Sequence, residues 1–313
     1  MQVVCRCGRA TPMLRSTSCR ILLSVQPSIA PVDRRLERAQ QHIDGLHSEM
    51  AKAFVEYGTY DVSHECDVQT REHAFWLNVH ETPDPIRWGV LIGDSVHQSR
   101  AALDNLAYQL SLITTNGRHV GGTAFPILDH PDRWAEVFPP TSAKAGQFTS
   151  RSGEHKLRKV PPLAKDMIKS LQPSNGKAGM NRFAEGPQTD DRIRRSLLIL
   201  EQFWNMDKHR VPATAITAGF LAPPDTSGIA FRGTSVLGGV PVTFGYKLPF
   251  ADRTKLVSWT PLDPFGVVPM EGEFRPFVLF EEGGPGDDQS VRGTLQTCLN
   301  DVRAVVDRFR KFF

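Results

Sequence analysis

Long apolar runs, an excess of one charge and a dense set of cysteines are all missing from this chain of 313 residues. No stretch of about 18 apolar residues is present, so we expect no membrane-spanning helix. Lys and Arg number 37 against 34 Asp and Glu, and a formal net charge of +3 does not by itself indicate nucleic-acid binding. The composition, with 40% hydrophobic residues, is that of a globular chain and excludes collagen-like or wholly disordered proteins.

Cysteines are too few and too unevenly placed for a disulfide framework. Two of them, Cys5 and Cys7, are separated by one residue, which is too tight for a zinc hook, and no second Cys/His pair follows nearby. We therefore expect free thiols, no metal, and a reducing, cytoplasmic setting. The five cysteines are Cys5, Cys7, Cys19, Cys66 and Cys298.

The first 32 residues contain four arginines and no acidic residue. Their best apolar stretch, 21–25, is shorter than the core of about 7–15 residues that a secretory signal requires. An Arg-rich and Ser-rich composition is also typical of organelle transit peptides. We expect residues 1–30 to be a disordered tail, or an extension ahead of a later natural start such as Met13, that takes no part in the fold.

The motifs of the commonest enzyme classes are absent. The chain has no phosphate-binding Gly-x-x-x-x-Gly-Lys-Ser/Thr loop, no dinucleotide fingerprint after a strand, no Gly-x-Ser-x-Gly and no His-Glu-x-x-His. The glycine-rich stretch 283–286 is typical of a hinge. These absences indicate no cofactor and lower the expectation of an enzyme.

Apolar residues at three- and four-residue steps predict the helices. The strongest pattern runs from Trp88 to Thr115, with an apolar stripe on one face and polar residues, among them Asp94, Asn105 and Tyr108, on the other. The predicted helices are 33–57, 88–115, 191–210 and 291–309, with two short candidates at 131–138 and 162–171.

Strands are predicted in two places. Residues 60–81 change to a period of two and indicate a β-hairpin. Short β-branched runs between residues 211 and 280 are joined by connections too short for crossover helices, which favours antiparallel pairing. These runs are 213–220, 228–231, 240–246, 255–259 and 274–280.

Together these patterns predict an α+β protein in which a helical layer packs on a C-terminal antiparallel β-sheet. Residues 31–210 form a mainly helical region that includes the hairpin 60–81 and a basic irregular segment, 121–190. Residues 211–313 supply the sheet and the C-terminal helix. We expect the two regions to form one body.

A first candidate site lies on the polar face of the helix 88–115. Arg100 and Asp104 are four residues apart and can pair. Phosphodiester cleavage needs a cation for the phosphate and a group that moves protons, which Arg100 and His97 could supply. The alternative is the solvated side of an amphipathic helix.

A second candidate is the helix end 205–210. Its cations, including Lys208 and His209, complement the negative end of the helix dipole. Asp207, however, continues the apolar stripe of this helix, and a buried carboxylate needs a partner. We expect Arg100, Asp104 and Asp207 to meet, as a structural ion network or as a site with Lys208 and His209 at its rim.

The third candidate is basic. Between residues 141 and 182 there are nine Lys and Arg against Glu154 and Asp166. Lys156, Arg158 and Lys159 could follow a phosphate backbone. Aromatic residues are sparse here (Phe148 and Phe183), so base stacking has little support, and a solvated loop is the alternative.

Three segments carry a resemblance to known proteins: 93–110, the tripeptide Phe125-Pro126-Ile127, and Asp207-Lys208-His209-Arg210. They resemble a family of uncharacterised bacterial and phage-associated proteins without an established activity, over residues 85–215. Members of that family often read Arg-Ser-Ala-Leu-Asp-His where this chain has Arg100 to Asn105.

An Arg followed by His five residues later is similar to the motif of HEPN domains, helical modules of which many are metal-independent ribonucleases of toxin and phage-defence systems. The resemblance implies that Arg100 would hold a phosphate. Asn105 stands at the His position, and asparagine cannot act as a general acid or base.

Three functions follow as hypotheses. The first is a non-catalytic binding or scaffold protein that contacts nucleic acid or an acidic protein partner. The second is a degenerate HEPN-like ribonuclease that uses Arg100 with His97 or His209, and Lys208. The third is a small-molecule-binding protein with a pocket between the helices and the late sheet.

Overall fold

A computed structural model of the chain describes residues 25–56, 58–119, 121–175, 189–207, 214–221, 233–237, 240–244, 248–260, 273–280 and 289–313. These residues belong to two compact units. Unit 1 takes the described residues of Met1–Arg38, His97–Glu201 and Cys298–Phe313, and unit 2 those of Ala39–Val96 and Gln202–Thr297. Both units therefore include residues from either side of position 210.

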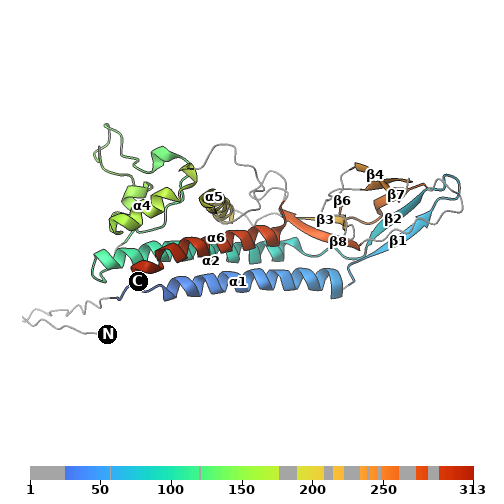
Figure 1. Cartoon of the computed structure of the whole chain (residues 1–313), viewed down its shortest axis with the longest axis horizontal. Coiled ribbons are helices and arrows are strands. Elements are labelled where there is room, and N and C mark those ends of the chain that lie inside the picture. The colour runs from blue at the N-terminus through green and yellow to red at the C-terminus, as the bar shows by residue number, and fades with distance from the viewer. Residues whose placement is uncertain are drawn as a thin grey trace, which may run out of the picture. The chain divides into compact units, whose positions relative to one another are not determined.

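The chain is a mixed α+β protein (Figure 1). None of the described helices is apolar enough over a sufficient length to cross a membrane. The helices are α1 (Ala30–Ala51), α2 (Pro85–Thr114), α3 (Gly153–Lys156), α4 (Pro162–Ser170), α5 (Asp190–Asp207) and α6 (Val291–Phe309). The strands are β1 (Tyr60–Cys66), β2 (His73–Val79), β3 (Thr214–Leu221), β4 (Gly233–Leu237), β5 (Val240–Phe244), β6 (Leu248–Pro249), β7 (Thr254–Trp259) and β8 (Glu273–Phe280).

The four long helices lie where the apolar stripes predict them, and most of the stripe residues are buried. Helix α1 begins before the expected Asp33, because Pro31 has a fixed φ that suits the first turn of a helix. It ends at Ala51, and a π-helical turn, Lys52–Glu56, replaces the rest of the predicted helix.

Helix α2 is buried on more than its apolar stripe. Asp94 and His97 are exposed, as expected for the polar face, but Arg100 is 5% exposed. The alternative of a solvated face therefore does not hold at Arg100. The reason is that Phe125 and Glu201, which lie outside this helix in the chain, contact Arg100 and shield it from solvent. Helical periodicity cannot predict contacts with other segments.

The irregular segment departs from prediction in two places. Residues 131–138 form only a 3₁₀ turn, Pro131–Arg133, because the chain then becomes extended and Val137 pairs with Phe148 in an antiparallel bridge. Helix α3 was not predicted, since a single turn shows no periodicity. Ser152 caps it by accepting a hydrogen bond from the His155 backbone N–H at 3.1 Å.

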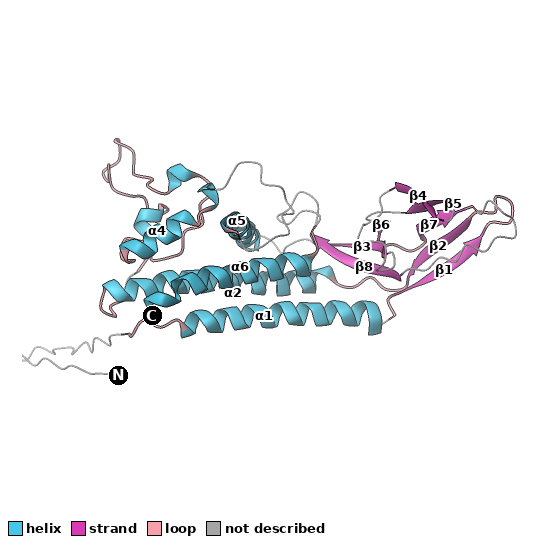
Figure 2. Ribbon diagram, in the orientation of Figure 1, coloured by secondary structure: helices cyan, strands magenta, loops and turns pink. Residues whose placement is uncertain are grey.

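All described strand pairs are antiparallel, and β1 and β2 form the predicted hairpin. One sheet has the order β1-β2-β7-β5-β4 and the other β6-β3-β8 (Figure 2). The larger sheet is thus not confined to the C-terminal region, because β2 pairs with β7. Strand β4 was not predicted, and the predicted run 228–231 lies outside the described residues.

The two hairpin strands and the neighbouring β7 share an apolar face of the larger sheet. Leu77, Phe250 and Leu256 are buried together, and partly buried aromatic and aliphatic residues pack against them. Side chains alternate along a strand, so residues 60, 62, 64 and 66 of β1 share one face. That face is apolar at Tyr60 and Val62 and polar at His64 and Cys66.

Candidate functional site

Arg100 is a buried cation with every guanidinium nitrogen bonded inside unit 1. Its side chain is 6% exposed. Nη1 donates to Asp104 Oδ1 at 2.7 Å, and Nε donates to Glu201 Oε2 at 3.0 Å. Nη2 donates to the Phe125 carbonyl at 2.8 Å. Charge-assisted hydrogen bonds to two carboxylates offset the cost of burying this guanidinium.

Arg100 and Asp104 together hold the backbone of Phe125. The Phe125 N–H donates to Asp104 Oδ1 at 2.9 Å, while its carbonyl accepts from Arg100. The Phe125 ring is fully buried. The two residues of α2 therefore contact both backbone groups of Phe125, and this contact fixes the chain that follows α2.

The other residues of the first two candidate sites are placed only in part. His97 is exposed and Asn105 half-buried on α2. Asp207 is the last residue of α5, and its side chain, like Lys208 and His209, lies outside the described residues. The expected contact between Arg100 and Asp207 thus stays a prediction.

Within the described residues, the carboxylate that α5 offers to Arg100 is that of Glu201, which sequence reasoning missed. Glu201 stands four residues after the buried Leu197, so it borders the apolar stripe. An acidic residue in that position is the signal that could have identified it.

A second buried ion pair joins α5 to α6. The Asp301 side chain is fully buried and accepts hydrogen bonds from Arg192 Nη2 at 2.6 Å and Ser196 Oγ at 2.7 Å. Burial and the nearby Asp301 charge raise the pKa of the Cys298 thiol to about 12. In the sequence, Asp301 stands beside Val302 on the apolar stripe of α6. A carboxylate at such a position is the signal that could have predicted a buried ion pair.

A basic hollow lies on the surface of unit 1, between residues 138 and 165. Its cavity volume is ≈ 450 Å³. The extended chain around the bridge Val137–Phe148, helix α3 and the start of α4 contribute its walls. It is lined by Phe138, Lys144, Gln147, Phe148, Ser150, Glu154, His155, Arg158 and Lys165.

The basic hollow is lined by three side chains that are positively charged at neutral pH and by one carboxylate, Glu154. Lys165 Nζ lies 3.0 Å from Glu154 Oε2. Partial burial alone would raise the pKa of Glu154, but hydrogen bonds from Lys165 and Trp134 and the charges of Lys165 and Lys169 lower it below its ordinary value. Glu154 is therefore ionised at neutral pH and balances Lys165.

The remaining cations of the basic hollow are Lys144 and Arg158. Lys144 Nζ lies 5.7 Å from the centre of the Phe138 ring. Arg158 is exposed, and it donates to the carbonyls of His155 at 3.0 Å and Gly121 at 2.9 Å. These two backbone contacts hold the guanidinium in place at the rim.

Of the residues expected to contact nucleic acid, Arg158 lines the basic hollow. Lys156 is half-buried on α3 and Lys159 is exposed, and both flank Arg158 in the chain. Two aromatic rings, Phe138 and Phe148, also line the hollow, and Phe148 is 44% exposed. The hollow has more aromatic surface than the composition of residues 141–182 predicts, because the antiparallel bridge brings these two rings together. Phe183 lies outside the described residues.

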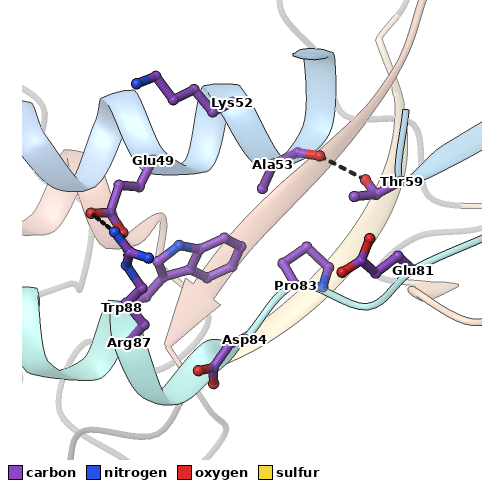
Figure 3. A pocket seen from close by; sticks show the side chains of 9 residues that line it. All are labelled: Glu49, Lys52, Ala53, Thr59, Glu81, Pro83, Asp84, Arg87 and Trp88. Atoms are coloured by element: carbon purple, nitrogen blue, oxygen red, sulfur yellow. Dashed lines mark hydrogen bonds and ion pairs between the residues drawn. The ribbon is translucent and has the colours of Figure 1, made fainter. Parts of the chain in front are cut away.

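Unit 2 has a hollow of its own at the end of α1 and the start of α2 (Figure 3). Its volume is ≈ 370 Å³, and Arg87 Nε bonds Glu49 Oε2 at 2.7 Å on one wall. Figure 3 shows the Trp88 ring between α1 and Pro83. Lys52, Glu81 and Asp84 also line the hollow, so both charge signs are mixed and no one ligand charge is favoured.

In the described part of the chain, no group of three or more His, Cys, Asp or Glu side chains is arranged to hold a metal ion. A comparison of the chain with protein-family models, with curated proteins and with solved structures finds no match. Function is therefore inferred from the geometry of the described residues.

Proposed function

We propose that this protein binds single-stranded nucleic acid without cleaving it, and that the basic hollow is where the strand docks. The observation that carries the proposal is the meeting of exposed cations with aromatic rings in one concave surface. Lysine and arginine contact phosphates, while an exposed ring offers a face on which a base stacks. The volume of ≈ 450 Å³ lies in the range of about 300–1,000 Å³ that is typical of ligand pockets.

The charges around the hollow fit a strand that continues past it. Arg158 is oriented by two carbonyls before any ligand arrives, so little side-chain entropy is lost when it meets a phosphate. Arg151 and Lys159 are exposed on either side of α3. They extend the positive surface beyond the pocket, as a chain of phosphates requires.

Cleavage of the strand is the weaker proposal. A HEPN-like ribonuclease needs a guanidinium that reaches the phosphate, and Arg100 is buried with all three nitrogens bonded to protein oxygens. Asn105 cannot move the proton of a 2′-hydroxyl. The Arg100 side of α2 is better suited to holding Phe125 than to catalysis.

We place this function in a cytoplasm. The free thiols of Cys66 and Cys298 support a reducing compartment.

The test is fluorescence anisotropy with a labelled single-stranded RNA and the same sequence as DNA. Lys144→Glu should weaken binding more than tenfold, because reversing a charge near a phosphate changes its interaction by about 2 kcal/mol even in water. The matched control is Lys311→Glu, since Lys311 is likewise exposed and lies 5.6 Å from a phenylalanine ring. Equal affinity of the two variants, or no binding by the parent at low salt, would refute the proposal.

A further inference from the structure

The polar end of the hairpin in unit 2 holds a thiol and two imidazoles in a row. Cys66 of β1 lies directly opposite His73 of β2, and His64 lies two residues earlier on the same face of β1. Cys66 Sγ is 3.6 Å from His73 Nε2, and His73 Nδ1 is 3.0 Å from His64 Nε2. Cys66 and His64 are exposed and His73 is half-buried.

The distances allow two proton arrangements along the row, and one of them prepares the thiol to lose its proton to His73. In that arrangement, the Cys66 thiol donates to His73 Nε2, and His73 then carries its proton on Nδ1 and donates to His64 Nε2. The two imidazole planes are 12° apart, so the N–H can point along the plane of both rings. If the thiol proton moves to His73, the resulting imidazolium keeps its hydrogen bond to His64.

Trp259 of β7 fixes the two imidazoles. His73 and Trp259 are register partners, with ring centres 5.3 Å apart and planes 17° apart. The His64 ring is 5.8 Å from the same indole. The indole plane is nearly parallel to both imidazoles and limits how far their rings can turn. A nucleophile, a base in reach of it and a third group that orients the base are the parts of an activated thiol.

A metal site does not fit this row. The two nitrogens of His73 face different neighbours, so His73 cannot point one nitrogen at an ion shared with both Cys66 and His64. The carboxylates next to the row in the chain have other partners: Glu65 pairs with Arg253, Glu72 pairs with Lys255, and Asp67 accepts the backbone N–H groups of Gln69 and Thr70. The arrangement is therefore one for moving a proton between sulfur and nitrogen.

We propose that Cys66 is a nucleophilic thiol that exchanges with low-molecular-weight disulfides, with His73 as its base and His64 as the residue that positions His73. His73 Nε2 takes the thiol proton, and Cys66 Sγ attacks one sulfur of the disulfide. A new S–S bond forms to Cys66 as the S–S bond of the reagent breaks. The departing thiolate takes the proton from His73, and Cys66 is left as a mixed disulfide, a modification that a second thiol reverses.

The test uses the full chain with Cys5, Cys7 and Cys19 replaced by serine and dithiobis(nitrobenzoic acid) as the disulfide at neutral pH. An ordinary thiol with a pKa near 8.5 is only a few per cent ionised there. We therefore expect His73→Asn to slow the reaction of Cys66 about tenfold, and His64→Asn to slow it less. His80→Asn is the matched control, because His80 follows the same hairpin and instead bonds Asp61 at 2.8 Å; its rate should equal the parent's.

Cys298 reports whether each variant is folded. It is buried, so it should react only after denaturation, whereas Cys66 reacts in the native protein. With glutathione disulfide in place of the aromatic reagent, mass spectrometry should find glutathione on Cys66. The inference fails if folded His73→Asn reacts as fast as the parent, or if Cys66 of the parent reacts no faster than N-acetylcysteine.

Discussion

Arg100 and the cations of the basic hollow lie in the same unit, but they differ in solvent exposure and in how many of their nitrogens are hydrogen-bonded to protein oxygens. Arg100 is 6% exposed and bonded through all its nitrogens, to Asp104, Glu201 and Phe125. Lys144 and Arg158 face a cavity open to solvent. A buried guanidinium contributes to stability, and an exposed one can take up a ligand. The comparison shows that burial, rather than residue type, separates the two roles.

The largest effect is expected for Arg100→Ala. It leaves two carboxylates and the Phe125 carbonyl without their donor, which costs about 3–5 kcal/mol for a buried ion pair. The free energy of unfolding, measured with denaturant, should fall by that amount. Arg34→Ala is the control, because the Arg34 side chain is 82% exposed and pairs with Glu37 at the surface. The structural role of Arg100 is wrong if the two variants are equally stable.

Arg100→Lys should have an intermediate effect. Lysine keeps the charge, but a single ammonium cannot reach Asp104, Glu201 and Phe125 from one position as the planar guanidinium does. One unsatisfied group costs about 1–3 kcal/mol. Thermal unfolding should place this variant between the parent and Arg100→Ala, and full parental stability would show that only the charge matters.

Lys144→Glu should leave the fold nearly unchanged. The described contact of the Lys144 side chain is with the Phe138 ring, and substitutions at such surface positions change stability by about 0.5 kcal/mol or less. The same denaturation series measures it. A loss as large as that of Arg100→Ala would remove the distinction between the two groups of cations.

The smallest effect concerns Glu154 and pH. Its pKa is below the ordinary value of 4.5 because Lys165 and Trp134 bond its ionised form more than burial opposes it. The stabilisation is therefore present above pH 4.5 and is lost as the pH falls through the lowered pKa. Parent and Glu154→Gln should differ in unfolding free energy at neutral pH and converge in acid; a difference that persists in acid would exclude the ion pair as its cause.

Elements with long local patterns were predictable from the sequence. The stripes of α2 and α6 identify both helices, and the alternation of residues 60–81 identifies the hairpin. Pairings between distant segments were not, because no local pattern records them. The burial of Arg100 depends on Phe125 and Glu201, and the edge-to-edge contact of β2 with β7 joins residues far apart in the chain.

The candidate sites divide in the same way. Sequence alone indicated Arg158 through its basic surroundings and the pairing of Arg100 with Asp104 through their spacing. The row from Cys66 to His64 could not be found, because it exists only in one register of the hairpin. A shift of one residue would send these side chains to opposite faces.

The most direct measurement is the salt dependence of single-stranded RNA binding. The slope of log K against log salt concentration is negative, and each phosphate contact that is removed should make it shallower by about 0.7 for a single strand. We expect the double variant Lys144→Gln/Arg158→Gln to lose about 1.4 from the slope, while Arg100→Lys keeps the parental slope. A double variant with the parental slope would contradict the assignment of phosphate contacts to the basic hollow. A shallower slope for Arg100→Lys would contradict it as well.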